Sequence, residues 1–176
     1  MKISDLNFEL LISQAEIEKR VMAIGAQLNA DYNDATPVLI GVLTGSFLFF
    51  ADLVKQLNIP CEITFIKLAS YQGTTSSRNI SEEINISIDI KGRDVVIIED
   101  IVDTGNTAHY LVNKLKLSGP ASIKLCALLF KPAALVREID ELKYIGFEIK
   151  NEFVIGYGLD YNQMGRNLND IYKQVD

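Results

Sequence analysis

The stretch from Val95 to Thr107 constrains the fold of this chain more than any other: Val-Val-Ile-Ile-Glu-Asp-Ile-Val-Asp-Thr-Gly-Asn-Thr. It opens with a run of β-branched apolar residues, which is typical of a strand buried on both faces in a parallel sheet. Acidic residues and a short polar turn follow, and from Ala108 to Leu115 apolar residues recur at helical spacing. The stretch therefore predicts a strand, a loop that carries carboxylates, and a helix.

The turn of Thr104, Gly105, Asn106 and Thr107 is suited to bind a phosphate. Consecutive backbone N–H groups in such a turn can point into one concavity, and the following helix adds the positive end of its dipole. The glycine allows a ligand to approach closely, and the threonines add hydroxyl donors. Helix capping would also account for Asp103 and Thr104, but it does not account for the acidic pair before them.

Glu99 and Asp100 place two like charges on neighbouring residues. At ~4 Å and an effective dielectric near 20, two unit charges repel each other by roughly 4 kcal/mol. A divalent cation or the hydroxyls of a ligand would remove this repulsion, and carboxylates combined with phosphates are the usual ligands of Mg²⁺. The stretch thus predicts a site for a phosphate-bearing ligand and Mg²⁺.

The composition argues against several other classes of protein. A net charge of −6, from 17 basic and 23 acidic residues, opposes nonspecific binding of nucleic acid or of an anionic membrane. The most apolar run, Val38 to Ala51, is interrupted by polar residues and is too short to span a bilayer. Cys61 and Cys126 lie in apolar runs, and with a single histidine they cannot form a Cys/His zinc cluster. We expect one domain, residues 1–176, in the cytoplasm.

The remaining patterns predict an α/β fold. Ser13 to Glu16 forms a capping box for a helix that ends near Ala30, and the polar stretch from Ser70 to Ile80 predicts a mobile loop. Further strands are expected at Val38–Leu43, Cys61–Ala69, Ile84–Ile90, Ser122–Phe130, Tyr144–Ile149, Phe153–Tyr157 and Asp170–Tyr172, and further helices at Phe47–Leu57 and up to about Ser118. Alternating strands and helices predict an open, mostly parallel sheet flanked by helices.

Three polar segments each follow a predicted strand. They are the turn at Thr44, the loop from Glu99 to Thr107, and Lys131. In open α/β sheets ligands bind beyond the carboxyl ends of the strands. We therefore expect these segments to converge on one active site.

The run Glu-Asp-x-x-Asp-Thr-Gly from Glu99 to Gly105 resembles the phosphoribosyl pyrophosphate (PRPP) signature of type I phosphoribosyltransferases, in the form found in the hypoxanthine-guanine branch. The similarity extends from about Leu39 to Tyr172. It implies the type I phosphoribosyltransferase fold, with a small hood built from the chain termini. It also implies PRPP, a 6-oxopurine base and Mg²⁺ as ligands, no nucleic-acid or membrane partner, and a homodimer or homotetramer.

The resemblance implies roles for individual residues. Asp103 would be the catalytic base that takes the N7 proton of the purine, and Lys131 would donate to its O6 atom. Glu99 and Asp100 would hold the ribose hydroxyls and one Mg²⁺, and Asp160 a second Mg²⁺. The other substrate-binding residues would be Thr44 and Gly45 for pyrophosphate, Ser70 and Tyr71 in a lid, Thr104, Gly105, Asn106 and Thr107 for the 5′-phosphate, Phe153 and Val154 for the base, and Arg166 for pyrophosphate.

The sequence departs from the family pattern at two places. Thr44 stands where the family often has a lysine or arginine, so the pyrophosphate contact would depend on backbone N–H groups. Ala133, Ala134 and Leu135 stand where the family often has charged residues, so no phosphate contact is expected from these three residues.

Several alternatives stay open at the level of the sequence. Lys131 could be a surface lysine, Phe153 a core residue, Asp160 a turn residue and Tyr71 an ordinary loop residue, while His109 is interpreted as structural. A PRPP-sensing regulator with the same fold would usually add a DNA-binding segment or a basic RNA-binding face, and the net charge of −6 does not favour this function. The sequence does not rank hypoxanthine, guanine and xanthine as substrates.

Overall fold

The computed structural model describes residues 1–67, 69–70, 80–81 and 86–176. Its centre is a five-stranded sheet in the order β4-β3-β7-β8-β9, and every neighbouring pair of these strands is parallel. The strands are β3 (Val38–Leu43), β4 (Glu62–Lys67), β7 (Asp94–Val102), β8 (Ser122–Phe130) and β9 (Leu142–Glu148). The expected parallel sheet is confirmed, and β3 and β8 have the predicted bounds.

The central strand β7 forms because its side chains are apolar on both faces of the sheet. The four residues from Val95 to Ile98 are fully buried. Val96 and Ile98 belong to the apolar cluster on one face and Val95 and Ile97 to the cluster on the other, as the alternation of side chains along a strand requires. A strand with this pattern has to lie inside the sheet with helices on both faces.

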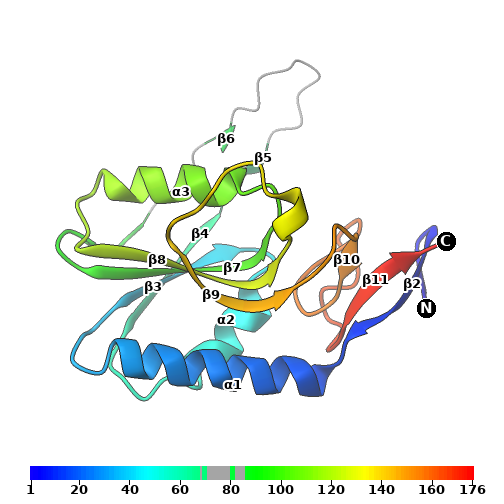
Figure 1. Cartoon of the computed structure of the whole chain (residues 1–176), viewed down its shortest axis with the longest axis horizontal. Coiled ribbons are helices and arrows are strands. Elements are labelled where there is room, and N and C mark those ends of the chain that lie inside the picture. The colour runs from blue at the N-terminus through cyan, green and yellow to red at the C-terminus, as the bar shows by residue number, and fades with distance from the viewer. Residues whose placement is uncertain (68, 71–79, 82–85) are drawn as a thin grey trace.

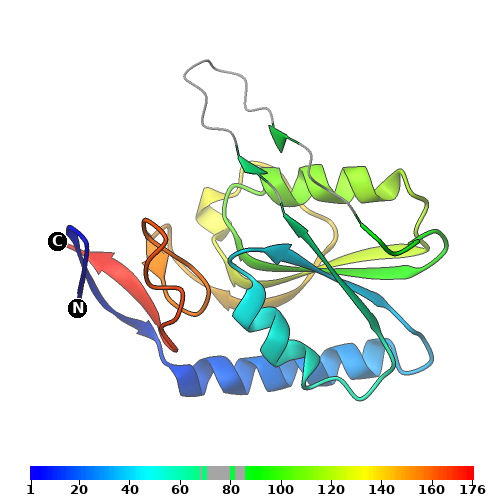
Figure 2. The same cartoon turned by 180° about the vertical axis from the view of Figure 1, so that it is seen from behind.

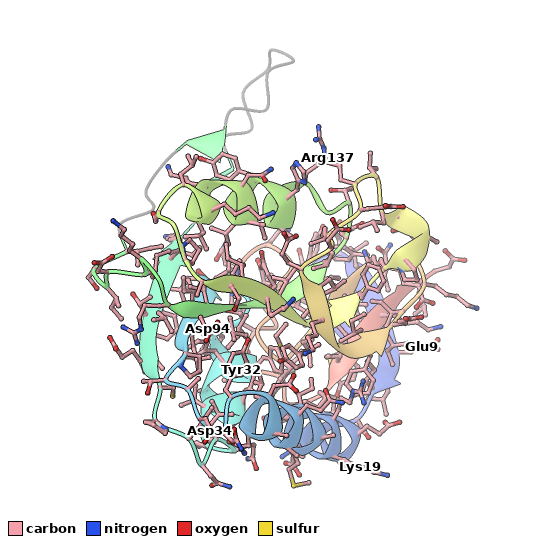
Figure 3. The ribbon with its side chains drawn as sticks, turned by 60° about the vertical axis from the view of Figure 1, so that its left-hand side comes forward. Glu9, Lys19, Tyr32, Asp34, Asp94 and Arg137 are labelled. Atoms are coloured by element: carbon pink, nitrogen blue, oxygen red, sulfur yellow. The ribbon has the colours of Figure 1, made fainter. Side chains whose placement is uncertain are left out.

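Helices cover both faces of the sheet. α1 (Gln14–Asp31) and α2 (Phe47–Val54) lie on one face and α3 (Asn106–Lys116) on the other (Figure 1). The predicted capping box is present, because the Ser13 side chain accepts a hydrogen bond from the Glu16 backbone and the Glu16 side chain accepts one from the Ser13 backbone. Figure 3 shows Tyr32 between α1 and the sheet, where it is 7% exposed.

A second, antiparallel sheet forms the hood that the family resemblance implies. Its order is β1-β2-β11-β10, with β1 (Lys2–Ile3), β2 (Leu6–Ile12), β10 (Val154–Ile155) and β11 (Ile171–Val175). Both ends of the chain lie in this sheet, on one side of the molecule (Figures 1 and 2). The strands β1 and β2 were not predicted, and the hood loop that follows β10 supplies part of the site described below.

Several predicted elements differ from the structure, and β9, β10 and β11 also have other bounds than predicted. A strand was predicted from Ile84 to Ile90, but residues 86–90 form no strand. Ile90 is buried, and Ile86 and Ile88 pack against the core without hydrogen bonding to a neighbouring strand. α2 ends at Val54 rather than Leu57, and β4 ends at Lys67.

Only the ends of the predicted lid fall within the described residues. They lie in the short strands β5 (Ala69–Ser70) and β6 (Ile80–Ser81), which pair with each other; Tyr71 and the rest of the predicted loop lie outside the described residues. After β8 the chain forms a short 3-10 turn, η1 (Pro132–Ala134). Across the part of the chain that the structure describes, no helix is long and apolar enough to cross a membrane.

Candidate active site

A cleft of about 390 Å³ lies at the carboxyl ends of β3 and β7. The chain passes from β3 to β4 on one side and returns to β7 on the other, so these strands flank the topological switch point of the sheet. The structure brings ten of the predicted site residues into the lining of this cleft: Thr44, Gly45, Glu99, Asp100, Asp103, Thr104, Gly105, Thr107, Asp160 and Arg166. The predicted convergence is confirmed for the turn at Thr44 and the loop from Glu99 to Thr107, whereas Lys131, the third predicted segment, does not line the cleft.

Glu99 and Asp100 lie within β7, whereas the sequence pattern predicted that they lie in a loop after the strand. β7 continues to Val102, and Glu99 pairs with Ala127 of β8. Burial, reinforced by the nearby Asp100 charge, raises the pKa of Glu99 well above its ordinary value. Burial likewise raises the pKa of Asp100 to about 6, against the opposing effects of backbone hydrogen bonds and of Arg166. The cleft therefore contains a pair of acids that are costly to ionise without a positive ligand.

The raised pKa of Asp100 predicts a stability effect with a definite sign. The carboxyl group ionises near pH 3.8 in the unfolded chain but near pH 6 in the folded chain, so its ionisation lowers stability progressively between these values and fully above pH 6. Asp100→Asn should therefore raise the free energy of unfolding by about 1–3 kcal/mol at pH 7.5 and change it little at pH 3.5.

Urea denaturation in EDTA at both pH values measures this effect. Asp34→Asn, which changes an exposed carboxylate, is the control and should leave stability nearly unchanged at pH 7.5. A loss of stability in Asp100→Asn at pH 7.5 would show that the ionised acid pair does not destabilise the folded chain.

The turn before α3 has the conformation of a phosphate cradle. Gly105 has φ +80° and is the N-cap of α3. A Cβ atom at this position would lie 2.8 Å from the carbonyl oxygen of Arg137, so the glycine is required both by the backbone and by the segment packed against it. The Val136 N–H donates to the Thr104 carbonyl at 3.0 Å. These contacts hold the backbone of the turn at the N-terminus of the helix, where N–H groups favour an anion.

One residue next to this cradle was not predicted from the sequence. The Arg137 Nε donates to Oδ1 of Asn106 at 3.2 Å, and Figure 3 shows Arg137 beside the end of α3. The residues directly after Pro132 were not expected to contact a phosphate. The 3-10 turn η1 reverses the chain there, so that Arg137 reaches Asn106 of the cradle. The arginine itself was the available signal, but its position depends on this turn.

Glycine also explains how two loops of the cleft approach each other. A Cβ atom on Gly45 would lie 1.5 Å from Oδ2 of Asp100, and a Cβ atom on Gly158 would lie 2.0 Å from the Gly45 carbonyl oxygen. Neither glycine can hold a side chain unless the group that it contacts moves, which is the Asp100 side chain for Gly45 and the turn at Gly45 for Gly158. The peptide bond between Leu43 and Thr44 is cis, and the buried Ser46 hydroxyl donates to the Val42 carbonyl at 2.6 Å.

Gly45→Ala should therefore disturb the site directly. The new methyl group would displace the Asp100 carboxylate or the turn at Thr44, and we expect a tenfold or larger rise in KM for the phosphate-bearing substrate, since displacements of about 1 Å at an active site have effects of this size or more. Gly92→Ala is the control, because a carbon added there has no atom within 4 Å, so its only cost is the positive φ of Gly92, at a position that does not line the cleft. Equal KM values for Gly45→Ala and Gly92→Ala in steady-state kinetics would show that the close contact between Gly45 and Asp100 is not needed for substrate binding.

Arg166 supplies positive charge to the acidic cleft. Its Nη2 lies 2.6 Å from Oδ1 of Asp160, and its Nη1 donates to the Gly158 carbonyl at 2.7 Å. The Gln163 N–H donates to the other Asp160 oxygen at 2.8 Å. The pair is close enough to Asp100 for both charges to influence its pKa. An arginine that is already oriented by a carboxylate and a carbonyl is suited to bind an oxyanion.

Asp103 and Lys131 form a pair at the ends of adjacent strands. The Lys131 Nζ lies 3.1 Å from Oδ2 of Asp103, and the lysine is 6% exposed whereas the Asp103 side chain is 45% exposed. The Lys131 N–H donates to the Val102 carbonyl at 3.0 Å. A buried lysine whose stem is packed can present its ammonium group at a fixed point, so the interpretation of Lys131 as a surface lysine is wrong.

Comparison with known proteins identifies the family. Residues 11–162 match the family described as the phosphoribosyl transferase domain. The chain belongs to this phosphoribosyltransferase family. It is 42% identical over 172 residues to the hypoxanthine phosphoribosyltransferase of Haemophilus influenzae, with 95% of each chain covered. It is 45% identical over 161 residues to the hypoxanthine-guanine phosphoribosyltransferase of Streptococcus pneumoniae, covering 91% of this chain and 89% of the relative.

The structure agrees with this assignment. A solved hypoxanthine-guanine phosphoribosyltransferase from Bacillus anthracis superposes with a TM-score of 0.90 at 33% identity, covering 97% of this chain and 100% of the other. The fold is that of a type I phosphoribosyltransferase, with the parallel sheet as its core and the antiparallel sheet as its hood. The protein is therefore an enzyme of the phosphoribosyltransferase class, and the resemblance found in the sequence is confirmed.

Two predicted base-binding residues of this phosphoribosyltransferase lie in the hood, outside the lining of the cleft. Phe153 is 43% exposed, and its ring meets Tyr161 edge-on with centroids 5.7 Å apart and lies 6.3 Å from Phe8. Val154 is buried in β10. Phe153 is thus not a core residue, and much of its side chain is open to solvent.

The acids of this phosphoribosyltransferase do not form a complete metal site by themselves. Within the described ranges, no group of three or more His, Cys, Asp or Glu side chains is arranged to hold a metal ion. Glu99, Asp100 and Asp160 nevertheless offer only oxygen atoms, and burial raises the pKa of Glu99 and Asp100, so a cation would relieve the cost of ionising them. Such a donor set fits Mg²⁺, which takes one or two protein carboxylates and completes its shell with phosphates and water.

Proposed function

We propose that this phosphoribosyltransferase is a purine salvage enzyme. It transfers the 5-phosphoribosyl group from PRPP to N9 of a 6-oxopurine, hypoxanthine or guanine, and gives IMP or GMP and pyrophosphate. The observation that carries this proposal is the cleft itself, which joins the turn before α3, a buried acid pair and Asp103, the carboxylate that the buried Lys131 contacts. The names of the relatives support the choice of base.

The cleft residues divide the work of binding PRPP. The 5′-phosphate lies in the cradle from Thr104 to Thr107, where backbone N–H groups and the dipole of α3 favour an anion. The ribose hydroxyls donate to Glu99 and Asp100, which relieves the cost of two buried carboxylates. The pyrophosphate group is held by the backbone of Thr44 and Gly45 and by Arg166, in keeping with the roles that the family resemblance implies.

Mg²⁺ fits this arrangement as a resident cofactor. One ion would be held by Glu99 and Asp100 and a second by Asp160. When bound with PRPP, Mg²⁺ neutralises the charge that develops on the departing pyrophosphate. Arg166 adds to this neutralisation from the side of the hood.

The base is recognised and activated by the pair at the ends of β7 and β8. The buried Lys131 donates to the O6 atom of the purine, whereas the 6-amino group of adenine does not accept such a hydrogen bond. Asp103 takes the N7 proton as N9 attacks C1′ through an oxocarbenium-like transition state, so positive charge does not have to remain on the purine. Phe153 stacks on the ring, and the backbone of Val154 reads its edge.

Other family-implied features stay predictions. Ser70 and Tyr71 would begin a lid that excludes water and so favours transfer over hydrolysis of PRPP. A single domain over residues 1–176, a cytoplasmic location and a homodimer or homotetramer belong to the same group. Light scattering on the purified protein measures the oligomeric state.

The proposal is tested by incubating the protein with PRPP, Mg²⁺ and hypoxanthine. We expect formation of IMP and pyrophosphate in equal amounts, and loss of both when EDTA removes the metal. A PRPP-sensing regulator is the rival function, and a gel-shift assay with DNA and RNA distinguishes it. Nucleic-acid binding in the absence of turnover would overturn the assignment as an enzyme.

A further inference from the structure

Two segments far apart in the sequence meet where Tyr157 reaches α2. Its hydroxyl donates to Oδ2 of Asp52 at 2.7 Å, and the tyrosine is only 7% exposed. The other oxygen of Asp52 lies 2.6 Å from Nζ of Lys55. Burial, together with this carboxylate, raises the pKa of Tyr157, so its hydroxyl remains a neutral donor. Figures 1 and 2 show the hood loop after β10 close to α2.

Tyr157 belongs to the turn that carries Asp160 and Arg166. Its N–H donates to the Leu168 carbonyl at 2.8 Å, and the next residue, Gly158, donates its N–H to the Arg166 carbonyl at 2.9 Å. Tyr157 has φ +47°, a conformation that a bulky residue adopts only when its surroundings hold it. The tyrosine side chain, with the neighbouring Leu159, therefore holds this turn on the core of the protein.

The partner on the core side begins directly after the turn at Thr44. Asp52 lies on α2, whose first residue is Phe47, so the helix connects the tyrosine to the loop that contacts Gly158. The Gly45 carbonyl is packed so tightly on Gly158 that a Cβ atom there would lie 2.0 Å from it. The predicted pyrophosphate site has two halves, the turn at Thr44 and Gly45 and the hood turn that carries Asp160 and Arg166. They meet at the contact between Gly45 and Gly158 and at the hydrogen bond between Asp52 and Tyr157.

We propose that the hydrogen bond between Tyr157 and Asp52 is a positioning device, which sets the spacing between the Asp160–Arg166 pair and the turn at Thr44 and Gly45. This inference rests on the proposed function, because it assigns both halves to the pyrophosphate group of PRPP. Neither residue touches the reacting atoms. Their effect on the reaction is exerted through the position of Arg166.

Tyr157→Phe tests the device, and the chain offers a matched control. Tyr144 is also buried, and its hydroxyl donates at 2.7 Å to Asp31, a carboxylate that likewise pairs with a lysine, Lys143. Each variant loses one buried hydrogen bond and should lower Tm by about 2–4 °C. Only Tyr157→Phe should raise KM for PRPP, by about 10- to 100-fold, because a small displacement of a binding group has effects of this size.

The kinetic pattern distinguishes positioning from stability. We expect KM for hypoxanthine to change less than KM for PRPP in Tyr157→Phe, because β10, which follows Phe153, is held separately by its pairing with β11. Tyr144→Phe should leave both values unchanged. Equal KM values for PRPP in the wild type and Tyr157→Phe, despite the lower Tm, would overturn the proposal.

Variants of the partner residue complete the test. Asp52→Asn keeps an oxygen acceptor for the Tyr157 hydroxyl and should retain a KM for PRPP near that of the wild type, whereas Asp52→Ala should reproduce the defect of Tyr157→Phe. The double variant Asp52→Ala, Tyr157→Phe should be no worse than either single variant, since both remove the same bond. If the increases in KM for PRPP of the two single variants added up in the double variant, Asp52 and Tyr157 would not act through the same hydrogen bond.

Amide hydrogen exchange supplies a readout that does not depend on turnover. The N–H groups of Tyr157 and Gly158 should exchange faster in Tyr157→Phe than in Tyr144→Phe, because the turn is less restrained. Unchanged exchange at these two amides would overturn the anchoring function. A wild-type protein without turnover would contradict the proposed function instead, and the exchange experiment would still decide whether the hydrogen bond anchors the turn.

Discussion

Replacing Asp103 with asparagine should lower kcat for nucleotide formation by about 100-fold or more, because a positioned general base contributes about 10²–10⁴ to the rate of such a reaction. Asparagine is nearly the same size as aspartate, but it cannot take the N7 proton of the purine. The residue is well placed for this task, since its side chain is 45% exposed toward the cleft and is oriented by Lys131 at 3.1 Å. The phosphate cradle does not depend on the carboxylate, so PRPP should bind with nearly normal affinity.

Steady-state kinetics and calorimetric titration with PRPP measure these two effects separately. Asp94→Asn is a matched control at the opposite end of the same strand, where the carboxylate accepts a hydrogen bond from Ser122 at 2.6 Å. It should leave kcat within about threefold of the wild type, since the carboxylate lies away from the cleft. A nearly normal kcat in Asp103→Asn would show that this residue is not the base.

Loss of the Lys131 ammonium group should remove recognition of the base. Lys131→Met keeps a long apolar stem in a site that is 6% exposed, and it deletes the donor to O6. A hydrogen bond from a charged group is worth about 1.5–3 kcal/mol, which corresponds to a rise of about 10- to 150-fold in KM for hypoxanthine. KM for PRPP should change by no more than about threefold, because Lys131 contacts Asp103 and the base but none of the groups assigned to the phosphates of PRPP.

The preference for hypoxanthine over adenine should decrease in the same variant, because no donor remains to select a 6-oxo group. Lys143→Met provides the comparison, since Lys143 pairs with Asp31 at 2.9 Å and contributes nothing to the cleft. Equal increases in KM for purine and PRPP in Lys131→Met would indicate a general disturbance of the site and would contradict base recognition.

The central part of the fold was predictable because its signal is local. The run from Val95 to Ile98 is apolar at every position, and only a strand covered on both faces can bury all of it. The capping box at Ser13 marked the start of α1 for the same reason, since its contacts extend over four residues. The cradle at Gly105 was also predictable, because a glycine between polar residues after a buried strand is typical of a turn that binds an anion.

The errors arose where pairing between distant segments determines the structure. β7 continues through Glu99 because Ala127 of β8 continues to pair with it, although the apolar pattern ends at Ile98. Leu6, Phe8 and Leu10 alternate with polar residues, but so short a pattern becomes a strand, β2, only by pairing with β11 at the other end of the chain. Conversely, the alternation that ends at Ile90 reflects burial against the core without a partner strand.

The candidate site shows the same division. Gly45, Gly105, Asp103 and Lys131 could be assigned to one edge of the sheet because each follows a strand of the parallel sheet. Arg137 and Tyr157 could not, since their positions depend on a 3-10 turn and on a contact between residues 105 apart in the sequence. Interactions of this kind fix the spacing of a site, and they are visible only after the chain has folded.

Transfer of phosphoribosyl groups to 6-oxopurines is the reaction that this cleft should catalyse. The most direct measurement is kcat/KM of the wild-type protein with PRPP and Mg²⁺ against hypoxanthine, guanine, xanthine, adenine and uracil. We predict nucleotide formation with one or more of the 6-oxopurines and a kcat/KM at least about 100-fold lower with adenine, whose 6-amino group leaves the buried lysine without an acceptor. Equal turnover with adenine, or no turnover with any base while PRPP still binds, would contradict this function.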